Sequence, residues 1–531
     1  MARPVVLAAS PASPIDVVRV AGVALVVLLL AVLVLWPVAA VALQGLLATQ
    51  AAWPWRAAVD TLIVALTATL GALAPAGVIG FSLMRVDIPG RRTVWQIFTA
   101  GTLMPPFSIA LALLVLAGPH GLLAADTSRP GLGVVALGQA IAFLPLAVVL
   151  VVRALARVPV ELEQAAEVLG ASRTTVARRV TLDLAGPEVL RAAVVVLGLC
   201  LADVATPLLL GGEARVLATL VVTAAAVDPS AAARAALALA ALAAAVALAA
   251  GTWRSDGTAA GDWAVLPRVE RGAPPALRWS LGVSVWGVAL ALAGLWAVVP
   301  LASLARGAGG IALEHWSVVA TAAGARALVS SVVLGLGVAL GGTALALAAA
   351  RVVERRRRPA GRAVEALVRI PLVIPGVAAG VGYVLLLAGA PVALATLPVL
   401  IALVACWELP VTVRAARAAL VRSDRSVEEA AISLGAGALT TLTRVVVPAL
   451  GPAAARMAAH LFAAGVLAVG TVIVLAGAGH ELGALTLLRL AAAGTTGAAC
   501  AVATALLALA SGALLLGRSL AGRRRGPTLL T

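Results

Sequence analysis

The stretch EQAAEVLGASRTTVARRVTLDLAGP, residues 163–187, is a polar segment in a chain of 531 residues of which 62% are hydrophobic. A second copy, EEAAISLGAGALTTLTRVVVPALGP, occupies residues 428–452. The interval between the two copies is half the length of the chain. A period of this length predicts a duplicated unit, fused head to tail, that carries one copy of the segment in each half.

The composition outside these segments predicts membrane spans. Charged residues make up only 12% of the chain. Apolar runs of about 20 residues or more recur throughout, and each can cross the roughly 30 Å of hydrocarbon in a bilayer as a helix. The sequence therefore predicts an all-α polytopic membrane protein.

The apolar runs number twelve, six in each half. The first half has runs at 20–43, 57–82, 94–117, 132–152, 189–210 and 231–251, and the second at 279–302, 327–350, 367–388, 391–413, 453–476 and 497–517. A stretch rich in glycine, proline and charge separates them. We expect a first repeat at 1–252 with its polar loop at 161–187, a cytoplasmic linker at 253–278, and a second repeat at 279–531 with its loop at 426–452.

The net charge of +16 comes from arginine, because the chain contains no lysine. The arginines gather in alternate loops, which under the positive-inside rule places both termini in the cytoplasm and accounts for the charge without nucleic acid. A Walker A loop needs a lysine on the nucleotide phosphates. We therefore expect a chain that is not an enzyme and binds no cofactor, with any ATP and Mg²⁺ used by a partner.

Each polar segment is predicted to form a short helix, a glycine turn and another short helix outside the bilayer, ending near Pro187 or Pro452. Acidic residues at the helix start suit the helix dipole, and Gly170 and Gly435 are positioned as left-handed C-caps. Paired alanines give a flat face that suits a groove on another protein. A single copy would favour an amphipathic hairpin that rests on the membrane surface, but two copies in the same topological position favour docking.

Both segments resemble the EAA loop of permease subunits of binding-protein-dependent ABC importers. That pattern has Glu-Ala-Ala, a glycine four residues beyond the second alanine, and a later hydrophobic–x–x–Pro region. The resemblance covers both halves and implies a type I permease fold with coupling helices that dock on two copies of an ATPase subunit. The implied coupling residues are Glu163, Gln164, Ala165, Ala166 and Gly170, and Glu428, Glu429, Ala430, Ala431 and Gly435. The first copy departs from the pattern, with Gln164 for the motif glutamate and Asp183 for the proline.

Two further stretches resemble fused, twelve-span permeases of the ferric iron type: LADVATPLLLGGEARVLATLVVTAA at 201–225, and GTVIVLAGAGHELGALTLLRLAAAGTTGAACAVATALL at 470–507. The same architecture serves thiamine and aminoethylphosphonate importers, so these substrates stay open beside ferric iron. The resemblance implies an extracytoplasmic solute-binding protein as a second partner and the bacterial inner membrane as the location.

Intramembrane carboxylates are costly and commonly face a pathway or a partner. Asp203, with a helix break expected near Pro207, is the first candidate for the translocation path, and Asp60 and Glu408 are further candidates. The structural alternative pairs Asp60 with Arg56 and Glu408 with Arg414 at the membrane interface.

Histidines and cysteines predict no metal site. The four histidines lack ligand spacing, and Cys200, Cys406 and Cys500 lie far apart in apolar runs. They fit packing or loop roles better.

Two other classes of protein remain to be weighed. RVDIPGRR at 85–92, a charged glycine-containing loop between the second and third spans, is also typical of major-facilitator secondary transporters. Neither that class nor a membrane scaffold without transport explains two docking loops.

Overall fold

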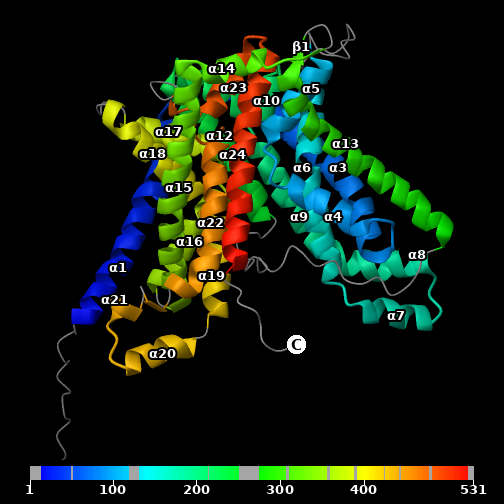
Figure 1. Ribbon diagram of the computed structural model, residues 1–531, viewed down its shortest axis with the longest axis horizontal. Helices are drawn as coiled ribbons and strands as arrows, with labels where there is room; N and C mark the ends of the chain where they lie inside the picture. Colours follow the sequence, from blue (N-terminus) through cyan, green and yellow to red (C-terminus); the bar gives the residue numbers. More distant parts are fainter. Residues whose placement is uncertain are drawn as a thin grey trace, which may run out of the picture.

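The computed structural model describes most of the chain as helices (Figure 1). The residues it describes are 14–48, 52–118, 131–212, 214–249, 274–306, 310–355, 359–387, 392–423, 425–441, 444–445, 447–476 and 481–523. Strand structure among them is one short antiparallel hairpin, β1 (Ala305–Arg306) with β2 (Gly310–Ile311). The expected linker at 253–278 lies outside them except for its last residues, so the boundary between the halves stays a prediction.

The first half is a succession of helices. They are α1 (Pro14–Leu30), η1 (Ala31–Leu35, a π-helix), α2 (Trp36–Leu47), α3 (Trp55–Arg85), α4 (Arg91–Gly101), α5 (Pro106–Ala117), α6 (Leu132–Ala156), α7 (Val160–Val168), α8 (Arg173–Val176), η2 (Ala177–Thr181, a π-helix), α9 (Leu182–Ala202), α10 (Ala205–Leu210), α11 (Leu217–Ala225) and α12 (Pro229–Ala249).

The second half is also a succession of helices, in which the bent pair α18–α19 takes the place of the single helix α6. Its helices are α13 (Pro275–Leu304), η3 (Glu314–Trp316), α14 (Ser317–Ala320), α15 (Ala322–Arg355), α16 (Pro359–Arg369), η4 (Ile370–Leu372), α17 (Gly376–Leu387), α18 (Val392–Trp407), α19 (Leu409–Arg422), α20 (Arg425–Ser433), α21 (Ala438–Thr441), α22 (Val447–Val466), α23 (Gly483–Ala492) and α24 (Thr496–Arg523).

Eight helices of the described residues are long and apolar enough to cross a membrane, and up to eleven spans result if each of three bent pairs counts as one. The pairs are α4 with α5, α16 with α17, and α18 with α19, bent by 99°, 108° and 60°. Each bend lies at or beside a proline, which removes a helical hydrogen bond and disfavours helix at the preceding residue. Every one of the twelve expected runs overlaps a helix. The eleventh run, 453–476, overlaps α22, and this helix is neither one of the eight long apolar helices nor part of a bent pair.

The duplication is visible in the helix boundaries. Under the register that aligns the two polar segments, the starts of α7, α8 and α9 correspond to the starts of α20, α21 and α22 without a shift. The bent pairs α4–α5 and α16–α17 also correspond, but with a shift of a few residues from this register. The second half therefore repeats the local folding of the first in the region around each polar loop.

The halves are held together because the first helices of each half pack on the other half. α2 packs on α17, and α1 packs on α16, while α13 packs against α5 and α4. The apolar cluster of the first half accordingly contains Val285, Ala289 and Leu292 of α13, and the cluster built on α15 and α16 contains Leu30 of α1. This exchange explains how two repeats form one helical body.

A single hydrogen bond marks the contact between η1 and α17. Pro37 lacks an N–H and cannot donate to the carbonyl of Leu33 four residues earlier. The hydroxyl of Tyr383, the one tyrosine of the chain, donates to that carbonyl at 2.5 Å. Gly382 beside it allows this approach, because an added Cβ would lie 2.1 Å from the carbonyl oxygen of Pro37. The hydroxyl of one half thus ties down a backbone carbonyl of the other half next to a proline.

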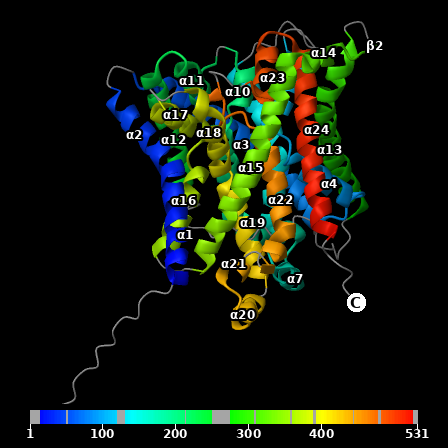
Figure 2. The same ribbon diagram turned by 60° about the vertical axis from the view of Figure 1, so that its left-hand side comes forward.

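The polar loops project from one end of the helical body. Figures 1 and 2 show α7 and α20 beyond the lower ends of the long helices, at the end where α1 begins and α24 finishes. The β1–β2 hairpin and α14 lie at the opposite end.

Candidate functional site

The candidate site consists of the two loops, α7 with α8 and α20 with α21. Gly170 and Gly435 have φ of +89° and +83°, which confirms the predicted left-handed turns. In each copy a backbone N–H beyond the glycine reaches back across it, from Ala171 to the Ala166 carbonyl and from Ala436 to the Ala431 carbonyl, both at 3.0 Å. This is the six-to-one bond of a Schellman motif, and it closes both helices in the same way.

An apolar tip stands at the end of each loop helix. Leu169 is 87% exposed and Leu434, its counterpart, is 88% exposed. The paired alanines next to them are exposed or half-buried, and α7 contains no buried residue. A leucine exposed to this degree at the same place in both copies, on a helix with a flat alanine face, is the kind of surface that a partner protein covers.

The first loop is attached to two helices of its own half through Glu163. Its carboxylate lies 2.9 Å from the guanidinium Nε of Arg85, the last residue of α3, and it accepts a hydrogen bond of 2.6 Å from the hydroxyl of Thr181 in η2. Both charged side chains are largely buried, with exposures of 14% for Arg85 and 12% for Glu163. Arg85 also donates to the Leu155 carbonyl of α6 at 3.3 Å.

The second loop repeats this attachment. Glu428, which corresponds to Glu163, is buried and lies 3.8 Å from the guanidinium of Arg351 in α15, the helix that corresponds to α3. The glutamate next in sequence, Glu429, is exposed on the helix surface. In both copies, therefore, the glutamate before the Gln/Glu-Ala-Ala triplet faces the spans and the triplet itself lies further out.

The segment after the first glycine differs from the expected separate short helix. α8, η2 and α9 run on without interruption as a span of 30 residues, Arg173–Ala202. Pro187 lies inside α9 and does not end it, because one missing N–H donor leaves the other hydrogen bonds of a long helix in place. Pro452 likewise lies inside α22. The first loop is therefore continuous with a membrane-spanning helix.

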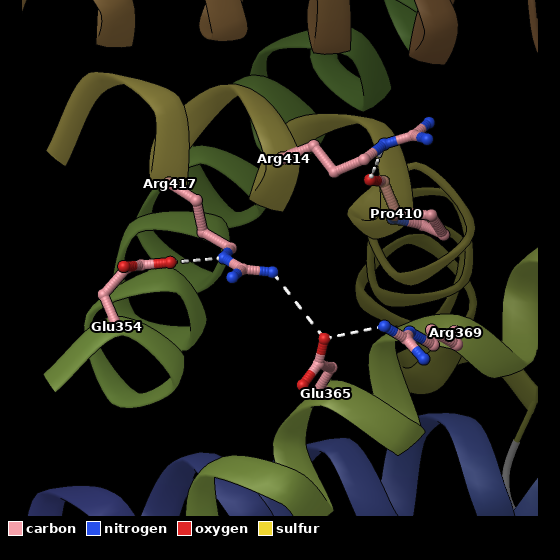
Figure 3. A network of polar contacts seen from close by, with 6 residues as sticks. All are labelled: Glu354, Glu365, Arg369, Pro410, Arg414 and Arg417. Carbon is pink, nitrogen blue, oxygen red and sulfur yellow. Dashed lines mark hydrogen bonds and ion pairs between the residues drawn. The ribbon is translucent and has the colours of Figure 1, made fainter. Parts of the chain in front are cut away.

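Further ion pairs connect the same end of the second half (Figure 3). Arg417 of α19 lies 2.6 Å from Glu354 of α15 and 3.7 Å from Glu365 of α16, and Arg369 binds Glu365 at 2.7 Å. This network joins three helices near the start of α20.

Among the pathway candidates, Asp203 lies at the break between α9 and α10. It is buried, and one carboxylate oxygen accepts from the backbone N–H groups of Ala205 and Thr206 at 3.1 and 3.3 Å. The other oxygen accepts from Gln139 at 3.2 Å. The chain breaks at residues 203–204, before the expected position, because Asp203 satisfies the first N–H groups of α10 and Pro207 is accommodated in its first turn, where no N–H is required.

The interface pairings proposed for the other two carboxylates are absent. Glu408 binds His460 of α22, Oε2 to Nε2 at 3.1 Å, while Arg414 donates to the Pro410 carbonyl at 3.0 Å (Figure 3). Asp60 is half-buried on α3 and forms no ion pair with Arg56 or another described residue. The spacing from Glu408 to Arg414 places the arginine on another side of α19, whereas α22 brings His460 to Glu408. The pathway role of Asp203, Pro207, Asp60 and Glu408 stays a prediction.

Within the described ranges, no group of three or more histidine, cysteine or carboxylate side chains lies close enough to hold a metal ion. His120 and His480 lie outside those ranges. His315 has its ring Nε2 3.1 Å from the Ala305 carbonyl, and the three cysteines are buried as free thiols.

Sequence reasoning missed the arginine partners of the loops. Arg85 and Arg351 read as ordinary positive charges beside a span, and their separation exceeds the repeat period by one position, so the repeat does not align them. Their place at the ends of corresponding helices was the available signal. Only the folded chain brings them to Glu163 and Glu428.

The fold and the paired loops define a duplicated helical protein of the membrane with two equivalent exposed loops at one end. Comparison with known families agrees: residues 76–253 match the family of the binding-protein-dependent transport system inner membrane component. Over this stretch, about a third of its length, the chain is similar to the inner-membrane permeases of binding-protein-dependent transport systems, and its apolar helices fit their type I permease fold.

Two curated relatives are ferric transport system permeases. The chain is 25% identical over 381 residues to a protein assigned to this class in Haemophilus influenzae, covering 66% of this chain and 59% of that protein. It is 24% identical over 455 residues to the ferric transport system permease protein FbpB of Actinobacillus pleuropneumoniae, covering 80% and 65%. The matches thus span less than two thirds of either relative.

Proposed function

We propose that this chain forms the translocation path of an ATP-driven importer, with α7 and α20 each docked on one copy of an ATPase subunit. The observation that carries the proposal is the duplicated, exposed helix tip at Leu169 and Leu434, attached by Glu163 and Glu428 to the spans. ATP and Mg²⁺ belong to the partner, and the chain supplies the path and its two conformations.

Ferric iron is the proposed substrate. Support comes from the names of the two relatives and from the stretches at 201–225 and 470–507. We assign substrate selection to an extracytoplasmic solute-binding protein, as the name of the matched family implies. Iron is cargo in this scheme, which requires weak, transient contacts along the path.

Both termini and both loops are proposed to face the cytoplasm. Arginines gather at the loop end of the described helices, among them Arg85, Arg157, Arg351, Arg369 and Arg422. The positive-inside rule assigns such an end to the cytoplasm.

Movement of the ATPase pair would reach the spans by two connections in the first half. Displacement of α7 acts on α3 through Glu163 and Arg85, and on α9 through Thr181 and the continuous α8–η2–α9 helix. In the second half, displacement of α20 acts on α15 through Glu428 and Arg351. The ion pairs of Arg417 with Glu354 and Glu365 then pass the movement from α15 to α16 and α19. Drawing the two loops together then turns both halves toward the outward-open state.

The test is intact-complex mass spectrometry of the tagged chain purified in a mild detergent with its co-expressed ATPase. We expect two ATPase copies per chain. Replacing Leu169 with Asp should reduce this to one copy, and replacing Leu434 as well should leave none, because a carboxylate cannot enter an apolar groove without a partner. Exposed Leu313, at the opposite end, provides the control as Leu313→Asp.

An uptake assay tests two parts of the proposal separately, the substrate and the class of transporter. The complex in liposomes should import radiolabelled ferric iron from a loaded binding protein only with ATP inside. ATP-dependent import of thiamine or a phosphonate in its place would correct the substrate alone. A chain that purifies without an ATPase and carries out proton-driven uptake would overturn the proposal in favour of a secondary transporter.

A further inference from the structure

One carboxylate beside the first loop, Glu188, has no counterpart at the corresponding position of the second half. In the first half, Glu188 of α9 forms ion pairs with Arg157, at the end of α6, and with Arg191, one turn further along α9. This carboxylate joins the end of one span to the start of the next, next to α7.

The second half keeps both arginines and lacks the carboxylate. In the register of the repeat, Arg157 corresponds to Arg422, Arg191 to Arg456, and Glu188 to Ala453. The register is fixed, since α9 and α22 begin at corresponding residues and Gly-Pro precedes the position in both, at 186–187 and 451–452. Neither Arg422 nor Arg456 forms an ion pair with any described residue.

A pocket occupies the place of the missing carboxylate. It has a volume of about 280 Å³ and lies between α19, α20 and α22, lined by Arg422, Arg456 and Ala453 among others. Glu428 also lines it, but that carboxylate lies beside Arg351. The exposed tip at Leu434 is not part of the lining, although Val427 and Glu428 of α20 are.

We propose that this pocket binds a phosphate group, which takes the position that Glu188 holds in the first half. Guanidinium groups bind phosphate with two parallel hydrogen bonds, and two of them on separate helices match a group with several acceptor oxygens. The volume accommodates a phosphate with a few attached carbons. Binding joins the end of α19 to the start of α22, as Glu188 joins α6 to α9.

Two sources could supply the phosphate. One is the headgroup of an anionic phospholipid, because the pocket lies where cytoplasmic-side spans end under the orientation proposed above. The other is a soluble phosphate ester. The binding itself depends neither on this orientation nor on the transport function.

Two variants decide the question by giving each half the kind of residue that the other half has at this position. Ala453→Glu installs the arrangement of the first half and should weaken binding at least about tenfold, or roughly 1.4 kcal/mol, without loss of folding. Glu188→Ala should create a second site. The variant with Arg422→Gln and Arg456→Gln should also lose binding; should it fail to fold, Ala453→Glu still decides the question.

Binding is measured on the purified full chain by two probes. Native mass spectrometry counts retained phosphatidylglycerol, with phosphatidylcholine for comparison, and calorimetry titrates glycerol 3-phosphate and inorganic phosphate. Phosphatidylglycerol lost in Ala453→Glu and gained in Glu188→Ala establishes the lipid source. The same pattern with glycerol 3-phosphate or inorganic phosphate establishes the soluble one.

Two outcomes would overturn the proposal. The first is equal binding of both probes by the native chain and Ala453→Glu. The second is weaker ATPase assembly in Ala453→Glu with unchanged anion binding, which would assign the pocket to a protein partner. Assembly and iron uptake are separate measurements, so failure of the proposed function would leave the phosphate result intact.

Discussion

Glu163 and Arg85 form a largely buried ion pair, 2.9 Å between carboxylate and guanidinium, that joins the first polar loop to the end of α3. Glu428 and Arg351 occupy the corresponding places in the second half, 3.8 Å apart. The pair that is shorter belongs to the loop that departs from the family pattern at Gln164 and Asp183. The two loops are therefore attached to their spans by the same kind of contact with different geometry.

Breaking this attachment should uncouple transport without preventing docking. In Arg85→Gln, Glu163 keeps Thr181 but loses its charged partner, which for a mostly buried pair costs about 2–4 kcal/mol. We expect normal ATPase assembly and ATPase activity with uptake per ATP reduced about tenfold. The exchanged pair, Arg85→Glu with Glu163→Arg, should recover part of the loss in a double-mutant cycle. Unchanged uptake per ATP in Arg85→Gln would show that α9 alone carries the movement.

Gly435 should not tolerate a β-branched residue. Its φ of +83° is in the left-handed region, where valine costs at least about 1–2 kcal/mol, so Gly435→Val should open the turn after α20 and reduce stimulation of ATP hydrolysis. Gly437, two residues on and outside the left-handed set, provides the control as Gly437→Ala. ATPase activity of the reconstituted complex with and without binding protein measures the effect; equal stimulation in both variants would contradict a role for the turn.

Removing the Tyr383 hydroxyl should loosen the contact between the halves. Tyr383→Phe removes the hydroxyl that donates to the Leu33 carbonyl, at a cost of about 1–2 kcal/mol in the membrane. Thermal unfolding in detergent should show a lower midpoint. Trp279→Phe, at a ring that is 60% exposed, should leave the midpoint unchanged. A Tyr383→Phe midpoint equal to the native value would mean that another donor reaches this carbonyl.

Two substitutions of Asp203 distinguish a role as a helix cap from a role in the translocation path. Asp203→Ala removes the acceptor of two backbone N–H groups and should destabilise the chain by about 1–2 kcal/mol. Asp203→Asn keeps that acceptor, so it should fold normally, and if the charge lines the path its iron uptake should fall about tenfold. Normal uptake by Asp203→Asn would reduce Asp203 to a helix cap.

Much of the fold could be predicted from the sequence, because the length of an apolar run and the backbone preferences of glycine depend only on residues that are close together in the chain. Apolar runs located the helices of the spans, and the spacing of Gly170 and Gly435 gave two left-handed turns that the structure confirms. The bends within three pairs were not assigned, although Pro105, Pro375 and Pro410 mark them, because a proline alone does not determine how sharply the chain turns there.

The side-chain pairings were less accessible. His460 and Glu408 are 52 residues apart, and Arg85 and Glu163 are 78 apart, so no sequence period connects them. The interface pairs expected from short spacing, Asp60 with Arg56 and Glu408 with Arg414, do not form. Another helix supplies a better-placed partner for Glu408, and a hydrogen bond to the backbone engages Arg414.

The sequence by itself determined that this chain lies in a membrane, that it is a duplication, and that each half carries a helix–glycine–helix loop, because these properties depend on local composition, length and repetition. Tertiary structure alone decided that the first helices of each half pack on the other half, that arginines attach the loops to α3 and α15, and that Arg422 and Arg456 border a pocket where Arg157 and Arg191 hold a carboxylate. These depend on which distant side chains the packed helices bring within a few ångströms, and packing is a property of the whole chain.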